Sequence, residues 1–60
     1  MAKSFDDIMA DGIKAEKDAI SYYTFLLPYI KNGNERRSIK HILNEEKDHL
    51  EILRKIWNRM

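Results

Sequence analysis

The chain has 60 residues, enough for one small domain and no more. It has no cysteine, which excludes disulfides, zinc–thiolate sites and iron–sulfur clusters, and its two glycines and one proline are too few for a turn-rich β fold. The formal net charge of +1 gives no general attraction to nucleic acid or to a membrane.

The first predicted element is a helix over residues 5–31. Ser4 is a suitable N-cap, and Asp6 and Asp7 fall in the first turn, where the helix dipole favours negative charge. Pro28 cannot donate a backbone hydrogen bond, so we expect it to bend the last turn, because the apolar spacing continues through Ile30. The competing outcome is that the helix ends near Leu27.

The segment Asn32-Gly33-Asn34 is the one clear break in the sequence. Asn and Gly tolerate the left-handed backbone that ends many helices, and Asn34 is a suitable N-cap for a second helix over residues 35–59. Two long helices with so short a link pack antiparallel. The sequence therefore predicts an all-α fold, a single helical hairpin over residues 1–60.

Each predicted helix carries an apolar stripe at 100° per residue. The stripes comprise Phe5, Met9, Gly12, Ala19, Ile20, Tyr23, Leu27 and Ile30 on the first helix, and Ile39, Ile42, Leu43, Leu50, Leu53, Trp57 and Met60 on the second. One hairpin covers only part of two such stripes. We therefore expect self-association into a four-helix bundle, as a homodimer or a larger even-numbered assembly.

Three polar residues interrupt these stripes, namely Glu16, Glu46 and His49. A buried carboxylate is costly unless it is neutralised, paired or bound to a metal. A turn centred on Gly33 places Glu16 level with about residue 50, within one helical turn of Glu46 and His49. All three side chains could thus reach a single point.

Glu46 and His49 form a Glu-x-x-His motif, and one chain holds half of the ligand set of a di-iron helical bundle. Two chains supply four carboxylates and two imidazoles, and the four negative charges balance two Fe(II) ions. This oxygen-rich set suits iron or manganese better than zinc. For each residue alone, a pairing with Lys or Arg, or a satisfied core histidine, is the simpler explanation; together they favour a metal site.

The segment around Glu16, with Ala19 three residues on and Tyr23 seven residues on, resembles the first-helix pattern of rubrerythrins and other ferritin-like proteins. The segment Asn44 to Leu50 is similar to their second-helix motif. The two-helix length resembles the encapsulated-ferritin type, in which subunits associate to complete the site. The resemblance implies iron ligation by Glu16, Glu46 and His49, with Tyr23 as a hydrogen-bonding neighbour of the ligands.

The leading functional hypothesis is a non-haem di-iron protein that binds iron or oxidises Fe(II) with dioxygen or peroxide, as a ferroxidase does, with Glu16, Glu46 and His49 as its catalytic residues. The alternative is a metal-free dimeric hairpin that acts as an RNA-binding or oligomerisation module. The near-neutral charge and the expected lack of a basic stripe along either helix weigh against RNA, so no nucleic-acid partner is expected.

The longest nearly apolar run, from Tyr22 to Ile30, is about half the ~20 residues that span a bilayer. With no signal-peptide pattern at the start, the sequence predicts a soluble cytoplasmic protein with no membrane partner. The end at Arg59-Met60 offers no tail that could target an encapsulin shell, so delivery into such a shell is not expected.

Overall fold

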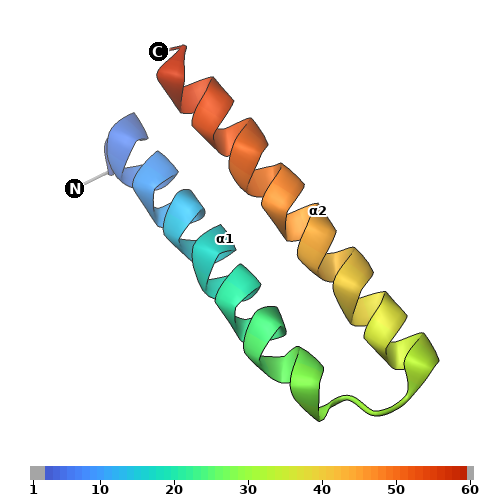
Figure 1. Cartoon of the computed structure of the whole chain (residues 1–60). Helices are drawn as coiled ribbons and strands as arrows, with labels where there is room; N and C mark the ends of the chain where they lie inside the picture. The colour runs from blue at the N-terminus through green and yellow to red at the C-terminus, as the bar shows by residue number, and fades with distance from the viewer. Residues whose placement is uncertain (1–2, 60) are drawn as a thin grey trace.

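The structure is a computed structural model that describes residues 3–59. It contains α1 (Phe5–Leu26), the short 3₁₀ helix η1 (Leu27–Tyr29) and α2 (Gly33–Asn58). The two long helices run antiparallel and side by side (Figure 1), and there is no strand within these 57 residues. The predicted all-α hairpin is therefore confirmed, while the place assigned to Met60 on the second stripe lies outside the described residues.

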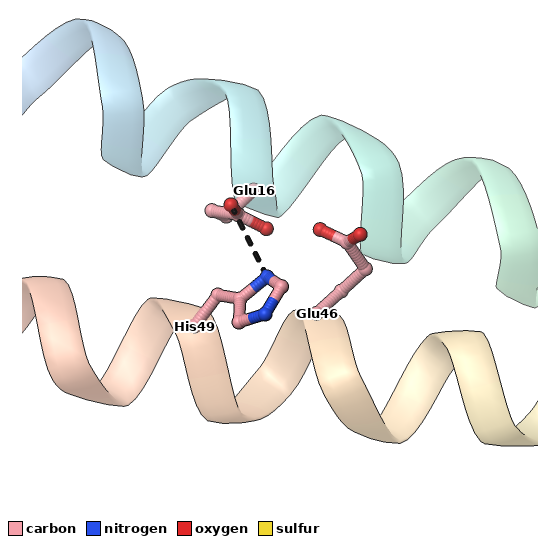
Figure 2. A group of neighbouring side chains, drawn as sticks. All are labelled: Glu16, Glu46 and His49. Atoms are coloured by element: carbon pink, nitrogen blue, oxygen red, sulfur yellow. Dashed lines mark ion pairs between the residues drawn. The ribbon is translucent and has the colours of Figure 1, made fainter.

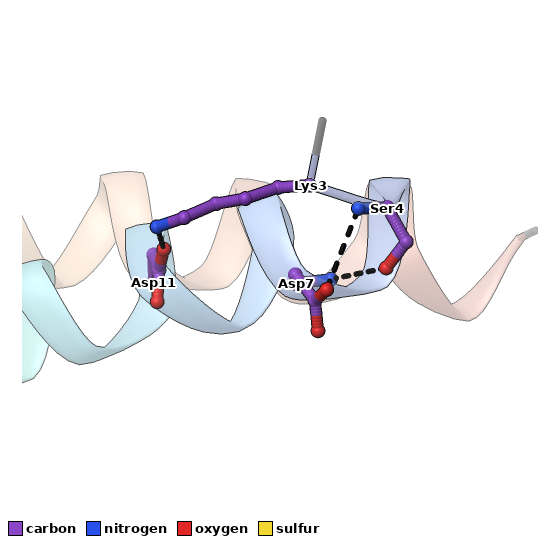
Figure 3. A network of polar contacts seen from close by, with 4 residues as sticks. All are labelled: Lys3, Ser4, Asp7 and Asp11. Atoms are coloured by element: carbon purple, nitrogen blue, oxygen red, sulfur yellow. Dashed lines mark hydrogen bonds and ion pairs between the residues drawn. The ribbon is translucent and has the colours of Figure 1, made fainter. Parts of the chain in front are cut away.

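The start of α1 is fixed by a reciprocal pair of hydrogen bonds (Figure 3). The Asp7 backbone N–H donates to Ser4 Oγ at 3.1 Å, and the Ser4 backbone N–H donates to the Asp7 carboxylate at 3.4 Å. This capping box satisfies two backbone donors that a helix N-terminus otherwise leaves unpaired. Lys3 also reaches along the helix to an ion pair with Asp11. The N-cap predicted at Ser4 is thus present.

The end of α1 differs from the expectation of a bent helix reaching residue 31. The α-helix ends at Leu26, and Leu27–Tyr29 form a single 3₁₀ turn with Pro28 in it. Pro28 has no N–H to continue the α-helical pattern, and the backbone turns into an extended conformation at Ile30. The competing outcome, termination near Leu27, describes this segment.

The start of α2 also differs in detail. Asn32, not Asn34, is the N-cap, and its side-chain oxygen accepts from the Glu35 N–H at 3.0 Å. No residue from 3 to 59 has a positive φ, so Gly33 begins the second helix in ordinary helical geometry and does not end the first in a left-handed one. Side-chain capping of α2 replaces the glycine-dependent turn that was expected.

The linking segment is tied down by Arg36. Its guanidinium donates to the carbonyl oxygens of Leu27 at 2.8 Å and Ile30 at 3.1 Å. The Leu27 carbonyl also accepts from the Ile30 backbone N–H at 3.1 Å, so Arg36 is its second donor. Carbonyls at the end of a helix lack partners within the helix, and Arg36 supplies a donor to the Ile30 carbonyl just beyond that end. At the other end of the hairpin, the Trp57 indole N–H donates to Asp6 at 2.7 Å.

The hairpin is a single layer of structure with principal extents of 45 × 23 × 12 Å. Met9 is the only residue between 3 and 59 that is buried. The radius of gyration, 14.3 Å, exceeds the roughly 10 Å expected for a compact 60-residue domain. Neither helix of the described chain has the combination of length and apolar character needed to cross a membrane.

Candidate metal site

The two helices bring Glu16, Glu46 and His49 together near the middle of the hairpin (Figure 2). Glu16 comes from α1, whereas Glu46 and His49 lie one turn apart on α2. A potential ligand atom from each residue lies within 4.8 Å of the other two. One turn before Glu16, Gly12 of α1 lies opposite Leu53 of α2: a Cβ at position 12 would be 3.7 Å from Leu53 Cδ1. This contact fits the same alignment of the two helices. The structure thus places the three predicted residues at one point.

Glu16 occupies the most enclosed position of the three. Its side chain is 21% exposed, and its Oε1 lies 3.7 Å from His49 Nδ1. Its other oxygen, Oε2, is buried and has no hydrogen-bond partner among the described residues. A buried carboxylate oxygen without a donor is unfavourable, so the position suits a cation or a proton.

The pKa of Glu16 is also shifted in the direction expected for a carboxylate without a cationic partner. A hydrogen bond that a protonated Glu16 can share with Glu46 raises the pKa of Glu16; desolvation and the negative charge of Glu46 raise it further, while His49 opposes the shift. When both carboxyl groups are ionised neither can donate to the other, and Glu16 Oε2 has no other donor among the described residues. A bound cation removes this conflict without a proton.

His49 is more exposed than the sequence pattern predicts. It lies beside the stripe of α2, but its side chain is 52% exposed in the single hairpin, so it is not a core residue here. One ring nitrogen faces Glu16, while much of the ring remains open to solvent. The helical position explains this, because His49 lies about 60° around α2 from Glu46, toward one open side of the hairpin.

Other candidate ligands do not join the group. His41 is exposed and pairs with Glu45 at 3.0 Å, and neither residue belongs to the group of possible ligands. Tyr23 is half-buried and packs edge-to-face against Tyr22, with ring centroids 5.1 Å apart. No hydrogen bond between Tyr23 and the three grouped residues is found in the described chain, so its role beside the ligands stays a prediction.

Two carboxylates and one imidazole at one point form a donor set for a divalent transition metal. The donors come from two helices, and the pairing of the helices depends on the capped, tied turn between them. Glu16 and Glu46 are half-buried between the helices, whereas His49 is exposed. The arrangement can hold a cation from one side and leaves the other side open.

Sequence reasoning missed the residues that hold the hairpin in this register. Arg36 belongs to neither predicted apolar stripe, yet it binds the carbonyls of the turn. Trp57 was expected to be a packing anchor, and its hydrogen bond to Asp6 joins positions 51 residues apart. An arginine one turn into a helix that follows a proline-containing turn is a signal that could have identified the first of these.

Comparison with known proteins gives no match: no protein-family model, no curated protein and no solved structure matches this chain. The resemblance to ferritin-like proteins therefore rests on the motif residues alone.

Proposed function

We propose that this protein binds iron through Glu16, Glu46 and His49, and that a second copy completes a di-iron centre of the ferritin-like kind. The observation that carries the proposal is the convergence of three ligand atoms within 4.8 Å around a buried, unpartnered carboxylate oxygen. Ion pairing with lysine or arginine, the simplest alternative for Glu16, is not seen among the described residues, where its ion-pair partner is His49.

The chemistry of the donors supports iron or manganese over other metals. Carboxylates favour hard cations and imidazole adds affinity for iron, whereas a zinc site would be expected to hold more nitrogen or sulfur donors. One chain offers Glu16 with Glu46 and His49, half of the set found in di-iron bundles. Two chains would supply four negative charges, equal to the positive charge of two Fe(II) ions.

The shape of the molecule supports a second copy. Stable domains pack at least two layers of secondary structure around a core, and this hairpin is one layer, 12 Å thick. It exposes 4933 Å², about 800 Å² more than a compact protein of 7.2 kDa. That excess is close to the area that each partner contributes to a standard protein interface, ~800 Å².

The exposed apolar side chains indicate which side the second copy covers. Ile8 and Tyr22 on α1, Tyr29 on η1 and Ile52 on α2 are exposed, with Tyr29 80% accessible. At 100° per residue and with antiparallel helices, Ile8, Tyr22 and Ile52 fall on one side of the hairpin, which we call the apolar face.

His49 opens onto the apolar face as well. Its position on α2 lies between Glu46 and the sector that holds Ile52. Ile52 and Ile56, beyond His49 toward the end of α2, line a surface hollow of about 520 Å³ together with Lys55, Asn58 and Arg59. A second copy docked on this face would cover the open imidazole and bring its own three ligands toward the first set.

Within such a site each residue of the chain has a distinct task. Glu16 holds a proton or a cation, and it gives up the proton when metal binds, since the raised pKa favours protonation only in the absence of a cation. His49 provides a nitrogen donor to the metal, and in the metal-free protein it partly offsets the effect of Glu46 on Glu16. Bound iron supplies redox chemistry, in which Fe(II) as substrate loses electrons to dioxygen or peroxide.

The direct test is anaerobic titration of the purified protein with Fe(II), or with Co(II) as a coloured substitute. We expect about one metal per chain, and loss of tight binding in Glu46→Ala and His49→Ala. Matched controls are Glu45→Ala and His41→Ala, which remove the same residue types from the same helix at an exposed ion pair. Equal binding by all four variants would remove the support for this site.

The redox step is tested separately. On admission of air to the Fe(II)-loaded protein, near-ultraviolet absorbance should grow faster than in the His49→Ala variant. Metal binding without accelerated oxidation would leave a binding protein and contradict the ferroxidase part of the proposal.

A further inference from the structure

The side of the hairpin opposite the apolar face carries a line of basic residues. Lys40, Lys47 and Arg54 follow one another at seven-residue intervals along α2, which is one unbroken helix over this span. They lie within about 40° of one another around the helix axis. All three side chains are exposed. This short basic line on α2 was not expected, because the spacing of seven hides the alignment among intervening acids.

These cations have no ion-pair partner among the residues that the structure describes. In residues 3–59, Lys40, Lys47 and Arg54 form no ion pair, and neither does Lys17, which lies level with Lys47 on the same side of α1. The ion pairs of the described chain use other cations, such as Lys55 on the outer side of α2. Four unpaired positive charges thus gather on one side of a chain whose net charge is only +1.

Between the basic positions lies an apolar floor. Leu43 and Leu50 follow Lys40 and Lys47 by three residues on the same side of α2, and both are half-buried. Ile13 and Ile20 of α1 are also half-buried, and lie across from the leucines. We call this surface, with Lys17, Lys40, Lys47 and Arg54 along its edges, the basic face.

The basic face is separate from the proposed metal site. Lys47 lies about 160° around α2 from His49, so a second copy on the apolar face leaves the basic face open. The occupancy of one face does not depend on that of the other.

We propose that the basic face binds an acidic amphipathic helix of another protein. Leucines with cations at seven-residue spacing repeat the pattern by which paired helices interlock apolar positions and match flanking charges. A partner helix with apolar residues in its seam and Glu or Asp at the same spacing would meet both the floor and the edges. Its acidic residues would pair with cations that this chain leaves free.

Two other occupants fit less well. A second copy of this chain offers no matching acidic line. Asp11, Asp18, Glu45 and Glu51 already form ion pairs within the hairpin. Glu35 and Asp48, which form none among the described residues, lie about 140° apart around α2. A nucleic-acid backbone would use the cations but would leave the leucines uncovered, and its phosphates do not repeat at the ~10 Å rise of seven helical residues.

The test uses a synthetic 21-residue peptide helix with Leu at its seam positions, Glu at the flanking positions and a fluorescent label. Binding to the full chain is followed by fluorescence anisotropy at low and moderate salt. We expect saturable binding that weakens with salt, and a loss of about tenfold or more in the K40E/K47E/R54E variant, because attractive pairs become repulsive. The same variant should bind a peptide with Lys in place of each Glu.

The matched control is R37E/K55E/R59E, which changes net charge equally on the other side of α2 and should bind the Glu peptide within about twofold of the unmodified chain. Circular dichroism verifies that both variants stay helical. Equal weakening by the two triple variants, or no recovery with the Lys peptide, would overturn the proposal. The proposal would also be overturned if a single-stranded oligonucleotide or an anionic vesicle bound more tightly than the Glu peptide and K40E/K47E/R54E abolished that binding. The basic face would then recognise a nucleic acid or a membrane and not an acidic helix.

Discussion

Glu16 is the residue at which the folded hairpin carries an unresolved electrostatic conflict. It faces Glu46 across the helix pair, and only a proton, the partly opposing His49 or a cation can balance the two carboxylates. The buried Oε2 shows that packing alone has not solved the problem. The simplest explanation is that Glu16 and Glu46 bind a metal, since a cation relieves the repulsion between the two carboxylates that the apo protein retains.

This conflict predicts how the stability of the metal-free protein depends on pH. The folded pKa of Glu16 is raised above its ordinary value of 4.5, so the folded state binds more protons than the unfolded state between the two values. The stabilising contribution is therefore complete below the ordinary pKa and is lost as pH rises through the folded pKa. Urea unfolding of the apo protein at several pH values should show this decline.

Glu16→Gln is the control for that experiment, because the amide keeps the shape and does not titrate. The variant should lose the Glu16 part of the pH dependence and be at least as stable as the parent at neutral pH. An apo protein whose unfolding free energy rises from acidic to neutral pH, unchanged by the variant, would contradict this account of Glu16.

At the scale of the elements, the hairpin is held by caps and ties more than by buried area. Ser4 with Asp7 caps α1, Asn32 caps α2, and Arg36 ties the turn. With a single buried residue among positions 3–59, each of these contributions is a large part of the stability of the monomer.

Ser4→Ala should destabilise the protein by about 1 kcal/mol, since it removes the side-chain acceptor of the capping box. Thermal and urea unfolding measure the change. Ser38→Ala is the matched control: the Ser38 hydroxyl donates to the Asn34 carbonyl inside α2, where alanine is the better helix former, so its loss should be neutral or slightly favourable.

Gly12 offers a second test within an element. A Cβ at this position would meet Leu53 Cδ1 at 3.7 Å, an ordinary contact, and the backbone φ is not in the left-handed range. Gly12→Ala should therefore stabilise the isolated hairpin by about 0.5–1 kcal/mol through helix propensity. Destabilisation measured at concentrations where the chain is dimeric would mean that the second copy approaches Gly12 closely.

Most of the element structure follows from local sequence, and the exceptions have identifiable physical causes. Ser4 and the Asn32-Gly33 break mark helix ends by short-range chemistry, so the two-helix topology was predictable. The end at Leu26 was not, because the apolar spacing through Ile30 competes with the missing N–H of Pro28. The grouping of Glu16, Glu46 and His49 was predictable from helix period and a short turn, whereas the exposure of His49 required the actual geometry of the pair.

At the scale of the whole molecule, the hairpin resembles half of a bundle in both shape and surface. It is a thin layer with one apolar face and one basic face, and its candidate ligands open onto the apolar side. Chains with so little buried surface depend on association, metal or both for stability. Dimerisation and metal binding should therefore be linked, each strengthening the other.

The linkage predicts that Tyr22→Glu combined with Ile8→Glu gives a monomer with weakened iron binding, because two charges would be buried in the apolar interface. Sedimentation velocity and the Fe(II) titration measure the two effects. Phe25→Glu is the matched control, since Phe25 is 74% exposed but lies on the outer side of α1, away from both faces. A parent chain that sediments as a monomer with and without iron would contradict the shared site.

The hydrogen bond between Trp57 and Asp6 has a practical consequence. The chain contains one tryptophan, and its indole lies at the open end of the hairpin, where the first turn of α1 lies beside the last turns of α2, rather than at the linking turn. Its emission therefore reports fraying of the terminal turns by itself, with no other indole to obscure the signal. An optical probe of end-opening is thus built into the native sequence, several helical turns away from the carboxylates at the centre.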